Sequence, residues 1–348
     1  MDNICIPEII NEHNFLLLEM NTLNQLNLLP KRGSTIKNGS LFQVIDKTST
    51  AVGRRGLKEL ICKPLISCEE IEERYKLSEI IMKNCDLKII DKHLNEICDF
   101  EKYHRKMILE VLHPYELYNL HLTYVQINKL LIYIQKKLKQ EEFAKLLNQK
   151  TLEEYINSYS KIFNLNELQK SSLNDSNSYS CCNFFNVNVV QELDKISNDI
   201  NELTSKSFEI VKKKLETICK EINVENWLKL TYTDQDGYHF TCTKIRGNLL
   251  QKSLKSSNDG IVIKTNTNQC KITSDEIRGL SLRWLNLKDI FNKKIKLHYI
   301  ESIKNLAKNY GYIFNDMKIF IEKLDIIKSN IQCKELYNYS KPEIITGT

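Results

Sequence analysis

The sequence predicts a mainly α fold with a small inserted antiparallel β unit, and three observations support this fold class. No glycine occurs between Gly56 and Gly237, and no proline occurs between Pro114 and Pro342. Both residue types interrupt helices and mark most tight turns, so their absence favours long helices. The spacing of apolar residues also changes, within residues 187–330, from helical to strictly alternating and back.

The composition is that of an ordinary globular protein and excludes several function classes. The chain has 348 residues, of which 42% are hydrophobic and 27% charged. It contains no apolar run long enough to span a membrane, and its start lacks a secretory signal. The eleven cysteines are scattered without a CxxC pair, so we expect free thiols in a reducing, intracellular compartment and no metal centre. No catalytic residue is predicted, because Ser/His/Asp, Cys/His and paired-carboxylate clusters are all missing.

The first half predicts short and medium helices. Ser67 and Glu70 have the spacing of a capping box, in which the serine caps a backbone N–H and the glutamate reaches back. Helical spacing continues over residues 86–111 and 115–138. The Ser- and Asn-rich segment 171–183 predicts a loop.

The second half predicts two long helices, over residues 187–222 and 273–330, with apolar residues three and four positions apart. At 1.5 Å per residue they would be roughly 54 Å and 87 Å long. The second begins with a capping box at Thr273 and Glu276, and a bend near Gly311 is compatible with its pattern. Packed antiparallel, two such helices would form a stalk.

A β unit is predicted between these helices. Apolar and polar residues alternate over 228–232 and 238–242, and Asp236-Gly237 between them is a strong hairpin signal. A third short strand, 261–263, follows Asp259-Gly260.

This β unit holds most of the excess positive charge. Residues 229–271 contain seven basic and three acidic side chains, a net charge of +4, whereas the whole chain carries +6. The seven candidate DNA-binding residues are Lys229, Lys244, Arg246, Lys252, Lys255, Lys264 and Lys271. We expect contact with a phosphate backbone without base reading, the alternative being a solvated lysine-rich surface.

Several motifs resemble one known family. Residues 39–65 read GSLFQVIDKTSTAVGRRGLKELICKPL. They resemble the opening of the core domain of MutS-type DNA mismatch-repair proteins, where Gly-Ser-Leu and Asp-x-Thr-x-Thr precede Gly-x-Arg and Pro-Leu. Residues 71–74 resemble the next helix of that family, and residues 99–102 resemble its Asp-Leu-Glu-Arg element.

The resemblance continues to the end of the chain. Residues 228–232 and 237–244 resemble the first two strands of the MutS clamp, and the helix from Thr273 resembles the returning lever. Residues 338–343, NYSKPE, resemble the segment that leads into the ATPase domain of the family. Gly56, where a leucine is usual, and Asp236, where a phenylalanine is usual, indicate a divergent branch.

The resemblance implies an architecture of a helical core with two long antiparallel lever helices and an inserted antiparallel β clamp. The implied segments are a core domain similar to MutS domain III (1–186), an outward lever helix (187–223), a clamp similar to domain IV (224–272), and a returning lever helix with the start of a link to an ATPase domain absent from this chain (273–348). A chain that ends just after Pro342-Glu343 is expected to be a piece of a longer protein.

The resemblance also implies partners and cofactors. The partners would be double-stranded DNA, mismatched or branched, a second MutS-like subunit and a MutL-like protein. The full-length protein would use ATP and Mg²⁺. For this chain we expect no cofactor and no ATPase activity: Gly33 and Gly39 are one residue too far apart for a phosphate-binding loop, and Ser40 stands where its lysine is needed.

Two further groups of residues have both a functional and a structural interpretation. Arg54 and Arg55 could contact DNA, but ion pairs within the core are favoured. Residues 320–322 spell the Phe-x-Glu motif that reads mismatches in the family, but they fall on the packing seam of the long helix. As an alternative function, the chain could be a segment of a meiotic-type homologue or a helical scaffold that acts mainly through protein partners.

Overall fold

A computed structural model describes residues 15–31, 33, 36–138, 142–171, 183–216, 228–233, 237–254, 261–265 and 269–344. The chain divides into two compact units, which we treat separately. The first unit comprises residues 1–159 and 303–348, and the second comprises residues 160–302. Helix α12 (Asp275–Tyr337) contributes its beginning to the second unit and its end to the first. The four segments proposed from the sequence remain a prediction.

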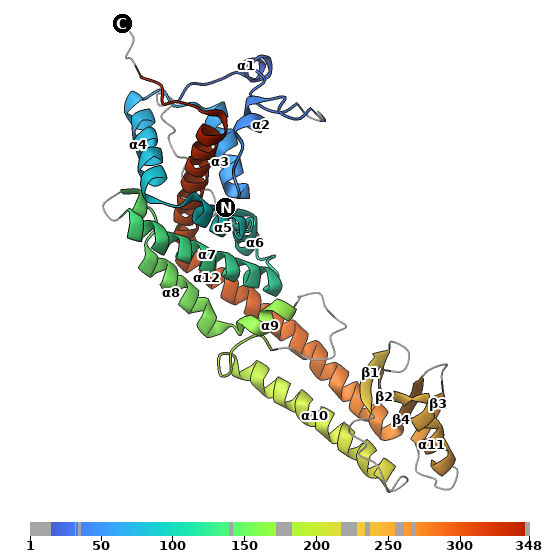
Figure 1. Cartoon of the computed structure of the whole chain (residues 1–348). Helices are drawn as coiled ribbons and strands as arrows, with labels where there is room; N and C mark the ends of the chain where they lie inside the picture. Colours follow the sequence, from blue (N-terminus) through green and yellow to red (C-terminus); the bar gives the residue numbers. More distant parts are fainter. Residues whose placement is uncertain are drawn as a thin grey trace. The chain divides into compact units, whose positions relative to one another are not determined.

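The elements described in the first unit are helices, apart from an isolated β-bridge between Phe15 and Leu65 (Figure 1). Its elements are α1 (Met20–Gln25), α2 (Leu41–Ile45), α3 (Ala51–Cys62), α4 (Cys68–Asn84), α5 (Leu87–Asn95), α6 (Phe100–Ile108), α7 (Pro114–Lys137), the 3-10 turn η2 (Glu142–Lys145), most of α8 (Gln149–Ile162) and the end of α12. The capping serine is confirmed, because the Ser67 Oγ accepts the Glu70 N–H at 3.4 Å where α4 begins.

Helix α7 is the centre of the first unit. Its residues at helical spacing are fully buried, including Leu117, Leu120, Tyr124, Ile127 and Leu131. The pattern predicted over 115–138 is therefore a buried helix, as its apolar period indicates. The pattern over 86–111 forms two helices, α5 and α6, separated by a short turn.

The second unit combines helices with one sheet. It contains α9 (Leu165–Lys170), α10 (Gln191–Glu216), β1 (Lys229–Thr233), β2 (Gly237–Thr243), α11 (Lys244–Leu254), β3 (Ile261–Thr265), β4 (Gln269–Ser274) and the beginning of α12. The strands are all antiparallel, in the order β1-β2-β4-β3. The mainly α fold class with a small antiparallel sheet is thus confirmed.

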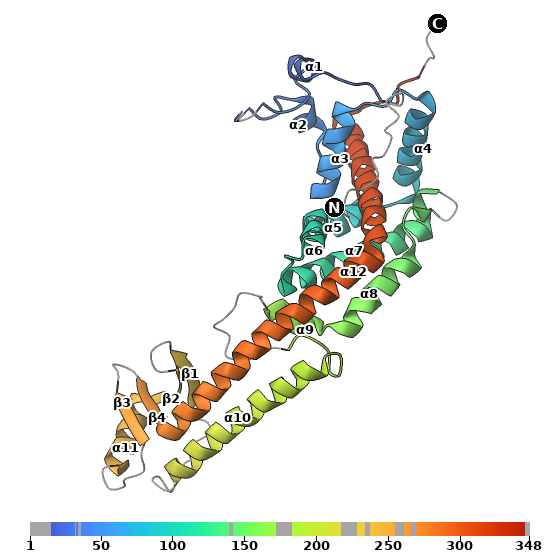
Figure 2. The same cartoon turned by 180° about the vertical axis from the view of Figure 1, so that it is seen from behind.

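Within this unit α10 and the beginning of α12 lie side by side and antiparallel (Figures 1 and 2). Glu192, near the start of α10, forms an ion pair with Lys294. Farther along α10, the Thr204 Oγ1 accepts the Trp284 indole N–H at 3.2 Å. Residue numbers rise along one helix as they fall along the other, which confirms the predicted antiparallel pair.

The start of α12 differs from the sequence prediction. The helix begins one residue after Ser274, whose Oγ accepts the Ile277 N–H at 3.2 Å, so the cap is Ser274 and not Thr273. Thr273 remains in β4, paired with Val262. Ser274 is the last residue of β4, paired with Ile261, so the strand ends at the residue that caps the helix. α12 then continues through Gly311 without a break, to Tyr337.

The β unit is also larger than predicted. The hairpin of β1 and β2 is confirmed, but β4 and α11 were missed, so three predicted strands become four strands and a helix. Gly247 and several polar residues weaken the helical pattern of α11. The turn residues Asp236, Asp259 and Gly260, and nearly all of the predicted loop 171–183, lie outside the described residues. None of the described helices has the length and apolar character needed to cross a bilayer.

Candidate nucleic-acid interface

One face of the sheet in the second unit is apolar and buried. Leu230, Phe240, Ile272 and Ile263 are opposite one another in the strand register. They pack in a single cluster with Ile277 of α12 and with Phe208 of α10. The strand alternation therefore directs the remaining side chains to the other face.

Helix α11 covers part of the apolar face. A Cβ at Gly247 would overlap the side chain of Cys270, so only glycine allows the helix to approach this closely. Cys270 is opposite Cys242 in the register, and both are buried. Burial raises the pKa of the Cys242 thiol to about 11, so it remains neutral in this cluster.

The opposite face carries a row of three lysines, which we call the lysine row. Lys229 is paired with Thr241, Thr241 with Lys271, and Lys271 with Lys264. Directly opposite residues in antiparallel strands point to the same face. Three strand spacings of about 4.8 Å separate the two ends of the row, roughly 14 Å in all.

The edges of the lysine row are open to solvent and its middle is not. Lys229 on β1 and Lys264 on β3 are exposed, whereas Lys271 is half-buried. Thr241 is buried, and its Oγ1 donates to the Lys229 carbonyl at 3.2 Å. None of the four strands contains an Asp or Glu. The four strands therefore contribute three lysines and no carboxylate to the sheet.

The other predicted basic residues lie elsewhere in the unit. Lys244, Arg246 and Lys252 belong to α11, which packs on the apolar face and not on the lysine face. Of Lys252 only the backbone position is described, and Lys255 lies outside the described residues. The structure thus brings together three of the seven predicted residues, and their contact with DNA remains a prediction.

The register that aligns these lysines could have been found from the sequence only by predicting β4. The signal was present, because Cys270 and Ile272 alternate with Gln269 and Lys271. It was obscured because the same residues immediately precede a strong helix pattern.

In the first unit, Arg54 and Arg55 form ion pairs, which confirms the favoured interpretation. The Arg54 Nε is 3.0 Å from Asp46 Oδ2. The Arg55 guanidinium contacts both Asp99 (2.7 Å) and Glu101 (2.5 Å). The pKa of Arg55 is raised, mainly by its hydrogen bonds to Asp99. Phe320, of the Phe-x-Glu spelling, is fully buried on the seam of α12, as predicted.

The motif at residues 46–50 also has a structural role. Its backbone N–H groups at Ser49 and Thr50, and the Thr50 hydroxyl, all donate to the buried Asp325 of α12, at 2.7–3.1 Å. A Cβ at Gly53 would overlap the Asp325 side chain, which explains a glycine in the first turn of α3. Lys328, also buried, donates to the Lys47 carbonyl at 2.6 Å. This network, which we call the buried junction, ties α3 to α12. Among the described residues, no group of His, Cys, Asp or Glu side chains is arranged to hold a metal ion.

Comparison with known proteins gives a consistent result over nearly the whole chain. The family described as MutS domain III matches residues 21–335. A homologue of mutS from Acanthamoeba polyphaga mimivirus is 26% identical, over 99% of this chain and 33% of its own length. The DNA mismatch repair protein MutS of Clostridioides difficile is 26% identical, over 98% and 34%. The DNA mismatch repair protein MSH2 of Arabidopsis thaliana is 22% identical, over 96% and 35%. The chain spans about a third of the length of these relatives.

Proposed function

This chain belongs to the MutS family of mismatch-repair proteins, and we propose that its second unit contacts the backbone of duplex DNA through the lysine row. The proposal rests on one observation: Lys229, Lys271 and Lys264 share one face of a sheet whose strands carry no carboxylate. Duplex DNA carries about one negative charge per 1.7 Å of its axis. A row of roughly 14 Å therefore meets several phosphates.

The contact is sequence-independent in this proposal. Lysine ammonium groups are point charges without the paired donors and acceptors that read base edges. The lysine row therefore holds the duplex and does not distinguish matched from mismatched base pairs. Membership of the family supports the further proposal that the chain connects this DNA contact to an ATPase domain that uses ATP and Mg²⁺. The chain works beside a second MutS-like subunit, on mismatched or branched duplexes, and with a MutL-like partner.

The proposal is tested by a salt titration of duplex binding, followed by fluorescence anisotropy. The row variant changes Lys229, Lys264 and Lys271 to Gln. For each lysine that contacts a phosphate, the slope of log K against log salt should become shallower by about 0.9. Matched and mismatched duplexes should lose the same affinity, because only backbone contacts are removed.

A matched control changes Lys244, Arg246 and Lys252 to Gln. It removes the same charge from α11, on the other side of the sheet. We expect this control to retain most of the slope. Equal losses in both variants would mean that general charge, and not the row, governs binding. An unchanged slope in the row variant would refute the proposal and favour a scaffold that acts through protein partners.

A further inference from the structure

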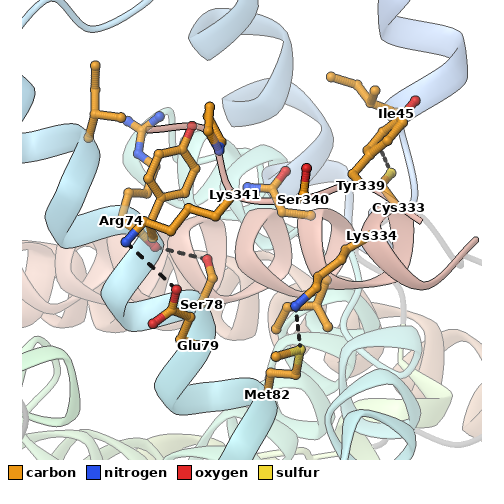
Figure 3. A pocket seen from close by; sticks show the side chains of 15 residues that line it. Ile45, Arg74, Ser78, Glu79, Met82, Cys333, Lys334, Tyr339, Ser340 and Lys341 are labelled. Carbon is orange, nitrogen blue, oxygen red and sulfur yellow. Dashed lines mark hydrogen bonds and ion pairs between the residues drawn. The ribbon is translucent and has the colours of Figure 1, made fainter. Parts of the chain in front are cut away.

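A cavity of about 460 Å³ lies in the first unit (Figure 3). One wall is a single face of α4, formed by Ile71, Arg74, Tyr75, Ser78, Glu79 and Met82. The other walls are Ile45 of α2, four residues at the end of α12 (Asn330, Ile331, Cys333 and Lys334) and the segment that follows it, residues 339–342. A helix face with this spacing normally packs against another element. Here it lines a space large enough for a small ligand or for two peptide side chains.

Two contacts hold the walls of this cavity together. The Lys341 Nζ is 3.0 Å from Glu72 Oε2 and 3.7 Å from Glu79 Oε1, and it lies over the Tyr75 ring. At the other end, the Lys334 Nζ is 3.6 Å from Met82 Sδ. Dashed lines in Figure 3 mark the contact of Lys334 with Met82 and the ion pair of Lys341 with Glu79. The single acidic residue of the lining, Glu79, is therefore already paired.

Arg74 differs from the other charged residues of the cavity. Its side chain is half-buried, and this burial lowers the pKa of Arg74. Glu70, one turn earlier, attracts it only from beyond ion-pair distance. Within the described part of the chain, the guanidinium has no hydrogen-bond or ion-pair partner. A cation that is partly removed from water without a partner costs free energy, which an incoming anion would recover.

We propose that this cavity binds a peptide segment in which a carboxylate adjoins an apolar side chain. The carboxylate pairs with the guanidinium of Arg74, whose planar donors suit a bidentate contact. The apolar side chain lies between Tyr75, Met82 and Tyr339, which line the same cavity. The charge of the lining, with three basic residues and one acidic residue that is already paired, selects an acidic partner. The apolar side chains of its walls can be buried against an apolar side chain of a peptide, and a phosphate backbone offers no such group.

The test uses the whole chain and a fluorescein-labelled, amidated peptide, Gly-Ser-Leu-Phe-Asp-Ser-Gly, followed by anisotropy. A second peptide has Asn in place of Asp. We expect the acidic peptide to bind at least about tenfold more tightly than the Asn peptide, as charged hydrogen bonds permit. Arg74→Gln should weaken the acidic peptide by a similar factor and leave the Asn peptide unchanged. The two losses should not add, because each removes the same contact.

Two controls separate binding from folding. Arg105→Gln changes an exposed arginine of α6 that does not line the cavity, and it should leave binding intact. Arg74→Gln should keep or raise the urea midpoint of unfolding, since it removes an unpaired cation. Equal affinity of the two peptides, wild-type affinity of Arg74→Gln, or an equal loss in Arg105→Gln would overturn the proposal. Displacement of the peptide by duplex DNA would overturn it as well, and would assign the cavity to nucleic acid.

Discussion

Lys328 of the buried junction and Lys264 of the lysine row are the same residue type in opposite surroundings. Lys328 is 1% exposed, and its Nζ donates to the Lys47 carbonyl (2.6 Å), to Ser49 Oγ (2.7 Å) and to Asp91 (3.0 Å). Lys264 is exposed on an edge strand, opposite another lysine. The first ammonium is fully used by the fold. The second contributes nothing evident to the fold and is available to a partner.

The difference extends to the two groups of residues. The residues that carry the family resemblance in the first unit, from Asp46 to Gly53, form a junction inside the protein. In the second unit the two edge lysines of the sheet, Lys229 and Lys264, are exposed. Substitutions in the buried junction should therefore change stability, and substitutions in the lysine row should change binding, with little overlap between the two effects.

The largest effect is expected at Asp325. Its carboxylate is fully buried and accepts hydrogen bonds from Ser49 and Thr50 beside Lys328. Asp325→Ala leaves three donors unsatisfied, the N–H groups of Ser49 and Thr50 and the Thr50 hydroxyl, and it removes one of the two carboxylates beside Lys328. We expect the free energy of unfolding of the first unit to fall by about 3–5 kcal/mol. Urea unfolding followed by circular dichroism measures this loss.

A double variant sharpens this result. Asp325→Ala with Lys328→Met also takes away the donor that serves the Lys47 carbonyl, Ser49 Oγ and Asp91, so it should be less stable than Asp325→Ala alone. A loss below about 1 kcal/mol in the single variant would show that water replaces the carboxylate and that the junction is not dry.

A second large effect depends on pH. His104 stacks on Phe314, and its Nε2 is 2.7 Å from the Tyr124 hydroxyl. Burial lowers the pKa of His104 to about 3. Between that pKa and the ordinary value of about 6.5, the unfolded chain binds a proton that the folded chain does not. The stability contributed by neutral His104 is therefore complete above pH 6.5 and is lost as the pH falls, by roughly 1.4 kcal/mol per pH unit.

Unfolding of the first unit in urea at pH 7, 6 and 5 measures this dependence. His104→Phe keeps the aromatic packing and should remove most of the slope. His298→Gln, on α12 in the second unit, is the matched control and should keep it. The same slope in wild type and His104→Phe would assign the acid sensitivity to other groups.

A smaller effect is expected within the second unit, at Gly247. Gly247→Val places side-chain atoms where Cys270 lies, so α11 must move away from the sheet. Overpacking of this kind costs about 1–3 kcal/mol. The loss should appear in the unfolding of the sheet, measured by hydrogen exchange of β2 and β4, and it should leave the first unit unchanged. Gly279→Val is a useful control, because a Cβ there meets nothing within 4 Å.

The sequence predicted the long helices and the hairpin because periodic apolar residues and turn glycines are local signals. It missed α11, whose pattern is weak, and β4, whose residues precede a helix signal. It also misplaced the cap, since Thr273 and Ser274 are both good capping residues, and the point at which β4 ends, after Ser274, decides which of them caps α12. Cross-strand pairing is not a local property of the chain.

The same reasoning applies to the candidate surface. Composition identified a basic segment, but alignment of Lys229, Lys271 and Lys264 requires the strand order β1-β2-β4-β3. The Asp325 and Lys328 network joins residues more than 270 positions apart in the chain, which no spacing rule reveals. The motif around Thr50 could be recognised by resemblance, and its contacts could not.

The smallest expected effect has the opposite sign. Lys264 is directly opposite Lys271, and like charges in such a pair repel, so a neutral residue should relieve the pair. Lys264→Gln should therefore leave the second unit as stable as wild type or more stable by a few tenths of a kcal/mol, most visibly at low salt because salt screens exposed charges. The same variant should weaken duplex binding, so stability and affinity would change in opposite directions at one residue. Lys328→Gln provides the contrast, because it should lower the stability of the first unit strongly and leave the salt dependence of DNA binding unchanged. Unfolding and anisotropy measured on both variants, at two salt concentrations, decide the matter. A clear loss of stability in Lys264→Gln would show that this lysine also has a structural partner, and the division between buried and exposed lysines would then fail at the residue on which it most depends.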